Sequence, residues 1–301
     1  MDYLKNIQRA IETIETNLQQ RIAIDQLARR AGFSFWHFQR VFAAVVGEPV
    51  AFYIRRRRLT AAAAELQTTR RRILEIALDY QFESHAAFTR AFRALFHVTP
   101  AESRRRRPFI ETLTRPQLTP EKLQHLARQT AMKPTLIKLP PLTLVGPSAP
   151  FIAAVSPDAN NLKIIPPLWH ALIQRKAELG PPRDRYMYGA CRCLPASQRT
   201  REDELAYLAG LSVKPLAKVP AGMSRWNVPA ATYACFTHRG PIARLSETIN
   251  YVYGAWMPRS KYQRDENRPE LERYDERFRD GGPDCELDYL VPVRPRKRPA
   301  R

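Results

Sequence analysis

The sequence has few cysteines and no long apolar run. Its four cysteines among 301 residues all lie in the second half, and we interpret them as reduced, mostly buried thiols. No window of about 18 consecutive apolar residues occurs, so no membrane span is expected. The first residues, Met1 to Lys5, lack the basic and apolar regions of a secretion signal. These absences together predict a cytoplasmic protein without a membrane partner.

Arrangements typical of enzymes and metal sites are also missing. No Ser/His/Asp or Cys/His constellation is visible, so no catalytic residue is assigned. Cys191 and Cys193 lack the second pair of ligands that a zinc site needs, and as alternate residues of one strand they are interpreted as buried packing. No cofactor and no metal are expected.

Positive charge is unevenly distributed along the chain. The net charge is +20, and residues 1–108 carry 19 Lys/Arg against 10 Asp/Glu, whereas residues 134–293 carry 21 against 17. Lysine is nearly absent from the first region, since 18 of its 19 basic residues are arginines, which suit forked contacts to phosphates and guanine edges. A basic field attracts any polyanion, but a ribosome-bound or membrane-surface protein would share it.

A short pattern occurs twice within residues 1–108. Each copy predicts a short helix, a tight turn and a second helix with aromatic residues on one face. The first copy contains Ala28, Gly32, Ser34, Phe38, Arg40 and Phe42, and the second contains Ala77, Gln81, Ser84, Phe88, Arg90 and Phe92. Two helix-turn-helix units joined by a helix over about residues 50–67 predict an all-α domain that places two recognition helices on double-stranded DNA.

In the first unit, Asp25 is the expected N-cap of the short helix and Ser34 that of the recognition helix. The outer face of the recognition helix is expected to carry Trp36, His37, Gln39 and Arg40. Glutamine suits adenine, arginine suits guanine, and an apolar ring can lie against a thymine methyl. A single tryptophan is more often part of a core, but its neighbours here favour base contact.

The second unit presents His85, Ala86, Thr89 and Arg90. Because Ala86 cannot hydrogen-bond to a base edge, we expect this unit to specify less sequence than the first. The arginine runs at 55–58 and 70–72 are interpreted as solvated faces, some of whose residues contact phosphate.

These motifs resemble the AraC/XylS family of bacterial transcription regulators over residues 1–107. The segments that carry the resemblance are 31–42 in the first unit and 73–92 with 99–104 in the second. The resemblance implies that Trp36, Gln39, Arg40 and Arg90 contact bases in the major groove. The chain departs from the family where His97 and Gln81 replace glycines and where His85-Ala86 replaces a polar pair. The first two departures are strained but tolerable, and the third changes the operator that is recognised.

Residues 109–133 are polar and interrupted by prolines, and are interpreted as a linker. A second repeat follows, because Glu204-Leu205-Ala206-Tyr207-Leu208 recurs as Glu286-Leu287-Asp288-Tyr289-Leu290. The pattern predicts a strand at 136–145, a helix at 162–179 and strands at 185–193 and 205–213. It then predicts a strand at 232–237, a helix at 242–256 and strands at 271–278 and 286–293. Two βαββ units would make residues 134–293 an α+β domain, with one antiparallel sheet, both helices on one face and a cleft between them, before a basic tail at 294–301.

Aromatic residues and one acid are expected to line that cleft. On a strand that alternates faces, Glu272 and Tyr274 share one side. The aromatic wall would comprise Trp169, Tyr251, Tyr253 and Trp256, with Trp226 as a further member. Such a site favours lipophilic cations. The alternative is a surface strand whose acids pair with Arg273, Arg277 or Lys261, and spacing alone favours neither.

The segments 228–241, 256–260 and 270–274 resemble the GyrI-like small-molecule-binding domain, and the order of domains is similar to the Rob type of AraC/XylS regulators. This resemblance implies that Glu272 and Trp256 contact a drug-like, often cationic effector. The leading interpretation is an effector-responsive transcription regulator, an activator with RNA polymerase as a further partner. One alternative is a hydrolase in which Glu272 and Tyr251 position a water, and another is a ligand-sequestering module.

Overall fold

The computed structural model describes residues 3–106, 132–156, 158–195, 197–201, 203–214, 219–279 and 282–296. The chain divides into two compact units, Met1–Thr119 and Pro120–Arg301, and each is described by itself. The predicted linker lies outside the described residues except at 132–133, and most of the basic tail lies outside them too.

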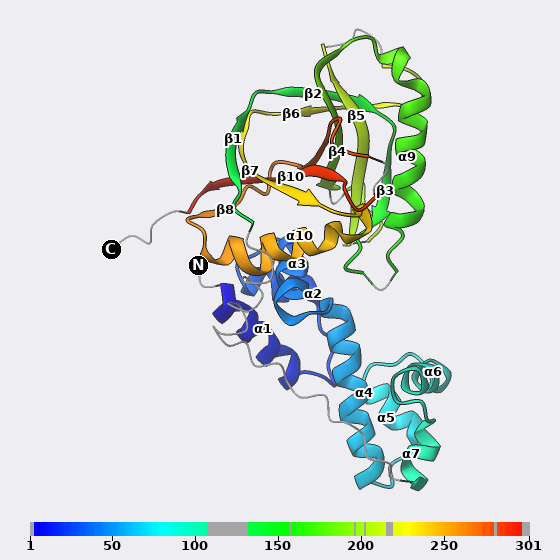
Figure 1. Cartoon of the computed structure of the whole chain (residues 1–301). Helices are drawn as coiled ribbons and strands as arrows, with labels where there is room; N and C mark the ends of the chain where they lie inside the picture. Colours follow the sequence, from blue (N-terminus) through cyan, green and yellow to red (C-terminus); the bar gives the residue numbers. More distant parts are fainter. Residues whose placement is uncertain are drawn as a thin grey trace. The chain divides into compact units, whose positions relative to one another are not determined.

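The first unit is helical, as predicted (Figure 1). Its helices are α1 (Tyr3–Thr16), α2 (Ile24–Arg30), α3 (Phe35–Val46), α4 (Val50–Thr68), α5 (Ile73–Asp79), α6 (His85–Phe96) and α7 (Pro100–Arg106). Helices α2 and α3 form the first helix-turn-helix unit, α5 and α6 form the second, and α4 joins them. Phe38 and Phe42 of α3 and Phe88 and Phe92 of α6 are fully buried, so the aromatic pattern marks the core face of each recognition helix.

The two helix-turn-helix units use the same backbone turns. The turn residues Gly32 and Gln81 both have positive φ, +73° and +64°. The residues that end the recognition helices, Gly47 and His97, have φ of +95° and +59°. The second helix-turn-helix unit therefore holds non-glycine residues in the left-handed region at both places where the first helix-turn-helix unit has glycine.

A serine side chain caps the start of each recognition helix. The Ser34 hydroxyl accepts a hydrogen bond from the His37 backbone N–H (3.3 Å), and Ser84 does the same for Ala87 (3.1 Å). Asp25 is not the N-cap of α2, because the helix begins at Ile24. The Asp25 carboxylate lies in the first turn instead and forms an ion pair with Arg29 one turn later.

The second unit contains a ten-stranded sheet in which all pairs are antiparallel. The strands are β1 (Thr135–Leu139), β2 (Leu142–Gly146), β3 (Ser148–Ile152), β4 (Pro182–Cys193), β5 (Glu204–Val213), β6 (Ser224–Val228), β7 (Ala231–Arg239), β8 (Tyr262–Arg264), β9 (Glu270–Tyr274) and β10 (Glu286–Pro295). Their order is β1-β7-β10-β9-β4-β5-β2-β6, with β3 paired to β5 and β8 to β10. The repeats β3-α9-β4-β5 and β7-α10-β9-β10 therefore meet where β4 pairs with β9.

Two helical segments lie on one face of this sheet. The first comprises α9 (Asn161–Arg175) and the 3-10 turn η1 (Lys176–Leu179), and the second comprises η2 (Ile242–Arg244), α10 (Leu245–Tyr251), the π-helical η3 (Val252–Trp256) and α11 (Met257–Arg259). Trp169 of α9 contacts Tyr274, and Trp256 of η3 contacts Phe236. The register places Phe236 and Glu272 opposite the same residue of β10, so both contacts are on one face. The predicted arrangement of the helices is confirmed.

Two strand predictions were wrong, and three further strands were not predicted. The strand expected at 136–145 is divided by Pro140 and Pro141, which cannot donate to a ladder; β1 then pairs with β7, whereas β2 pairs with β5 and β6. Strands β3, β6 and β8 were not predicted. The strand expected at 271–278 ends at Tyr274, because Asp275 begins a turn in which its carbonyl accepts a bond from Phe278 (3.0 Å).

Replacing His97 by glycine should raise the free energy of unfolding of the first unit by about 1 kcal/mol. A left-handed conformation costs an L-residue roughly 1–2 kcal/mol, and the added freedom of glycine in the unfolded chain returns only part of this. Urea unfolding followed by far-ultraviolet circular dichroism would measure the change. His97→Ala is the control, since alanine keeps the Cβ; an equal gain in both variants would contradict the argument.

Candidate functional site

Helix α6 has one buried and one exposed face. His85 and Arg90 are exposed and Thr89 is half-buried, whereas Phe88 and Phe92 on the other side are fully buried. The Thr89 hydroxyl is buried and has no hydrogen-bond partner among the described residues. These three polar side chains thus lie on the face of α6 where the sequence placed them.

Helix α3 differs from its expected arrangement. Of the four residues expected on its outer face, only Arg40 is half-exposed, and its guanidinium lies 4.3 Å from the centre of the Trp36 ring. Trp36 and Gln39 are 3% and 4% exposed, and the Gln39 amide nitrogen has no hydrogen-bond partner among the described residues. The prediction of an open outer face was therefore wrong for Trp36 and Gln39.

His37 was also wrongly placed on the outer face. It is 4% exposed, and its ring packs against the rings of Tyr3 (5.6 Å between centroids) and Phe33 (4.9 Å). These contacts join α1 to α3, so His37 belongs to the core of the first unit.

The arginine run on α4 is largely structural. Arg56 forms an ion pair with Glu48, and Arg57 forms one with Glu15 at 2.8 Å. Arg58 donates to the backbone carbonyls of residues 18 and 20 after α1. The first arginine of the run is exposed. Three of these four arginines therefore hold α4 to its neighbours, and the solvated-face interpretation was wrong for them.

In the second unit, Glu272 lies at the centre of a hydrogen-bonded group. The hydroxyls of Tyr207 and Tyr274 donate to its Oε2 atom at 2.5 and 2.7 Å. The indole N–H of Trp169 donates to the Tyr207 oxygen (3.1 Å), and the Trp169 and Tyr274 rings meet edge to face at 4.7 Å. The structure thus brings together three of the predicted site residues: Glu272, Tyr274 and Trp169.

Electrostatics keep the two phenols protonated. Burial, with the negative charge of Glu272, raises the pKa of Tyr207 and Tyr274 well above the usual range for a tyrosine. Both hydroxyls therefore remain donors at neutral pH and stabilise the ionised carboxylate. Glu272 itself is half-buried.

Gly189 of β4 leaves the space that this group occupies. A Cβ atom at this position would lie 2.0 Å from the Tyr207 hydroxyl and 2.7 Å from the Glu272 Oε2 atom. Sequence reasoning missed both Gly189 and Tyr207. Tyr207 stands in the repeated pentapeptide, which was a signal, but its pairing with Glu272 depends on a register that the sequence does not show.

The other predicted aromatic residues gather around Phe236. Its ring centroid lies 5.2 Å from that of Trp256 and 6.4 Å from that of Tyr251, whose hydroxyl donates to the Met132 carbonyl (2.9 Å). Phe236 and Glu272 are two strands apart in one row of the sheet, about 10 Å given the usual strand spacing. The predicted ligand residues therefore form two groups on one face.

A second carboxylate lies beside Glu272 on the same face of β9. Glu270 is 3% exposed and accepts hydrogen bonds from the hydroxyls of Tyr253 (2.5 Å) and Tyr289. The buried guanidinium of Arg264 pairs with it at 3.1 Å. Tyr253 was expected in the aromatic wall, but its hydroxyl donates to this second carboxylate instead.

Trp226 does not join the site. It lies on β6, in the core cluster of the opposite sheet face with Leu271 and Leu290, and the Arg192 guanidinium is 4.0 Å from its ring centre. Leu271 and Glu272 point to opposite faces because they are adjacent in a strand.

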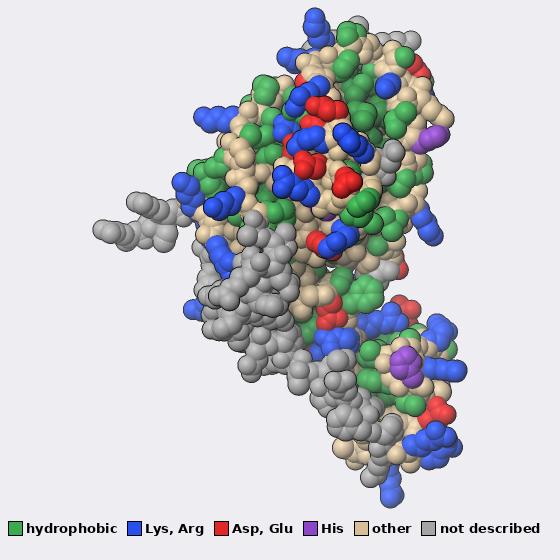
Figure 2. Space-filling model, in the orientation of Figure 1, with side chains coloured by type: hydrophobic (Ala, Val, Ile, Leu, Met, Phe, Trp, Pro, Cys, Tyr) green, Lys and Arg blue, Asp and Glu red, His purple; other side chains and the backbone are tan. Residues whose placement is uncertain are grey.

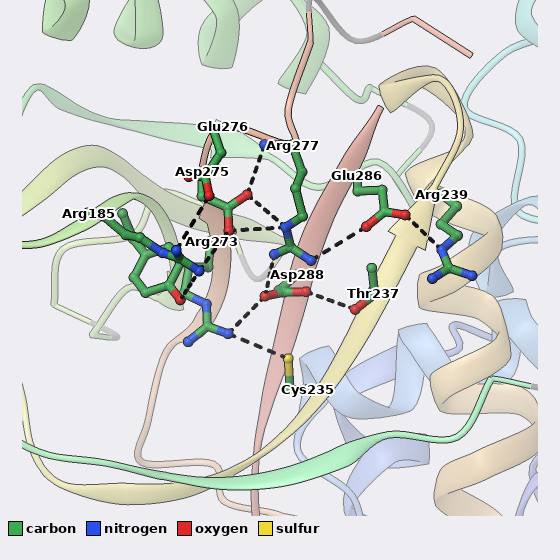
Figure 3. Close-up of polar contacts among 11 residues, drawn as sticks. Arg185, Cys235, Thr237, Arg239, Arg273, Asp275, Glu276, Arg277, Glu286 and Asp288 are labelled. Atoms are coloured by element: carbon green, nitrogen blue, oxygen red, sulfur yellow. Dashed lines mark hydrogen bonds and ion pairs between the residues drawn. The ribbon is translucent and has the colours of Figure 1, made fainter. Parts of the chain in front are cut away.

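The opposite sheet face carries a network of ion pairs (Figure 3). Asp288 binds Arg273 at 2.8 Å and Arg277 at 3.0 Å, and Arg277 also binds Asp275 at 2.8 Å. The alternative in which Arg273 or Arg277 forms an ion pair with Glu272 was therefore wrong. Figure 2 shows basic and acidic side chains intermixed on this unit, in keeping with its near-neutral charge.

The cysteines are free thiols, but only Cys235 and Cys285 are buried. Burial raises the pKa of Cys235 to about 11, so this thiol is protonated at neutral pH. Cys193 is exposed because it is the last residue of β4, and buried packing was the wrong interpretation for it.

Within the described residues, no group of three or more His, Cys, Asp or Glu side chains could hold a metal ion. Over the same part of the chain, none of the helices has the length and apolar character needed to span a membrane.

Comparison with known proteins gives matches in both units. Residues 27–106 match a helix-turn-helix domain, and residues 132–294 match the GyrI-like small molecule binding domain. The chain is 28% identical to the transcriptional regulator Rob of Salmonella typhimurium and 29% identical to the right origin-binding protein of Escherichia coli, in each case over 98% of this chain and all of the relative. A structure of SAV2435 bound to tetraphenylphosphonium is similar to 54% of this chain and covers 94% of its own, with a TM-score of 0.42 and 17% identity.

These matches confirm the family resemblances in both halves of the sequence. The chain combines an AraC-type helix-turn-helix domain with an effector domain, as a DNA-binding transcription regulator does. Since the match over residues 132–294 covers more than half of its length, the chain belongs to the GyrI-like small-molecule-binding family.

Proposed function

We propose that the chain activates transcription in response to a lipophilic cation that binds beside Glu272. The observation that carries this proposal is the Glu272 carboxylate, half-buried between the hydroxyls of Tyr207 and Tyr274 and next to Trp169. A carboxylate among aromatic rings attracts a cation through both its charge and the ring faces. Tyr251 and Trp256, around Phe236 on the same face, supply the apolar wall.

In the first unit, α3 and α6 would enter successive major grooves of a promoter or operator. The base-contacting residues would be Arg40 from α3 and His85, Thr89 and Arg90 from α6, joined by Trp36 and Gln39 of α3 once DNA binding exposes these two buried side chains. Gln39 and Thr89 support this assignment, because each has a buried polar atom without a hydrogen-bond partner among the described residues. Such atoms cost free energy until a partner is offered, and a base edge would supply one.

Activation would require contact with RNA polymerase once the chain is bound near a promoter.

Hydrolysis is the less favoured role for Glu272. Two phenols donate to its Oε2 atom and stabilise its charged form, which makes the carboxylate a weaker proton acceptor for a general-base role. The arrangement therefore favours binding over turnover.

Replacing Arg40 by alanine should weaken binding to specific DNA by roughly 1–3 kcal/mol and relax the preference at one base position, because a bidentate contact to guanine is lost. Arg90→Ala should cost less, because Ala86 one turn before it cannot hydrogen-bond to a base edge. Titrations against the operator and against its single-base variants would measure both. Equal costs, or a larger cost for Arg90, would contradict the ranking of the two helices.

Replacing Glu272 by glutamine keeps the shape of the side chain and removes its charge. Binding of tetraphenylphosphonium should fall by about tenfold or more, about 1.4 kcal/mol, because the attraction between the cation and a partly desolvated negative charge is lost. Isothermal titration of the full chain would measure this loss, and affinity for operator DNA without ligand should not change.

Glu276→Gln is the matched control, because Glu276 is an exposed acid close by in the sequence that pairs with Arg185. It should leave cation affinity as it is. If Glu272→Gln also leaves it unchanged, Glu272 lies outside the binding site.

A further inference from the structure

Strand β9 carries two carboxylates that are both bound by tyrosine hydroxyls. Each accepts hydrogen bonds from two tyrosine hydroxyls: Glu272 from those of Tyr207 and Tyr274, and Glu270 from those of Tyr253 and Tyr289. Glu270 and Glu272 are alternate residues, so both point to the face that the helices cover.

The internal repeat explains part of this likeness. Tyr207 of β5 and Tyr289 of β10 occupy the same position of the repeated pentapeptide, and each donates to one of the two β9 carboxylates. The two halves of the unit thus supply equivalent phenol donors to neighbouring carboxylates. The kind of cation that binds one of these carboxylates therefore indicates what kind of cation the other can bind.

At Glu270 the protein itself supplies the cation. The Arg264 guanidinium is fully buried, and its Nε–H donates to the Glu270 Oε1 atom at 3.1 Å, the same oxygen that Tyr253 contacts. A buried ion pair is stable only when its geometry is good and the remaining polar atoms are satisfied. This carboxylate with its two phenols therefore accommodates a planar cation with N–H donors.

We propose that the effector of Glu272 carries a guanidinium or amidinium group, which binds there as Arg264 binds at Glu270. This inference rests on the proposed function and names the chemical class of the ligand. A planar N–H fork can bond to the carboxylate while the phenol oxygens offer further lone pairs. The rings of Trp169 and Tyr274 would flank the flat cation, as aromatic rings do around arginine.

Benzamidinium is a suitable probe, and benzamide is its neutral counterpart of nearly the same shape. Isothermal titration of the full chain should give an affinity for benzamidinium at least tenfold above that for benzamide. The comparison uses the unaltered protein, so it does not depend on whether a variant folds. The net charge of +20 repels cations, so the bulk charge does not favour benzamidinium over benzamide.

Two variants locate the interaction. Glu272→Gln should reduce the preference for benzamidinium over benzamide to less than threefold, whereas Glu276→Gln should leave it unchanged. If benzamidinium binds no better than benzamide while tetraphenylphosphonium still binds through Glu272, the guanidinium class is wrong and the cation site stands. If Glu272→Gln alters the binding of neither cation, the proposed site fails as well.

Discussion

The hydrogen bonds from Tyr207 and Tyr274 to Glu272 are the interactions on which the arrangement of the effector domain depends. A carboxylate that is partly removed from water needs donors, and here they come from β5 and from β9 itself. The Tyr207 donor can reach across β4 only because residue 189 is a glycine. The meeting of the two repeats at β4 and β9 thus creates the place where the acid lies.

The two faces of the sheet divide the charged groups between them. Acids on the helix-covered face are held by phenols, and at Glu270 also by Arg264. On the other face, Asp288 and Asp275 are held by arginines. Alternation along β9 and β10 therefore places acids held by phenols and acids held by arginines on opposite faces of the sheet.

The sequence predicted the helical unit well, because its signals are local. The serine cap, the turn residues and the aromatic periodicity each act within a few residues. Ser34 caps its helix as expected, and Ser84 caps the second recognition helix in the same way. The Asp25 prediction failed because the helix starts two residues earlier than a cap at Asp25 would place it. The burial of Trp36 and Gln39 could not be predicted from helical periodicity. Periodicity shows which residues share a face of the helix but not what packs against that face.

The effector domain was only partly predictable, because its site depends on strand register. Alternation along one strand correctly put Glu272 and Tyr274 together, whereas Tyr207 comes from a strand 65 residues away. Trp226 was assigned to the wrong face, because its strand was not recognised. Proline explains the divided first strand, and a fuller weighting of Pro140 and Pro141 would have predicted the break.

The central claim is that the Glu272 carboxylate, with its two phenols, is the anchor for a cationic effector. Crystals of the full chain grown with tetraphenylphosphonium test it most directly. The account predicts that the cation lies against the Glu272 carboxylate, with at least one of the Trp169 and Tyr274 rings in contact. A cation bound elsewhere, with the Glu272 group unchanged and distant from it, would contradict the account.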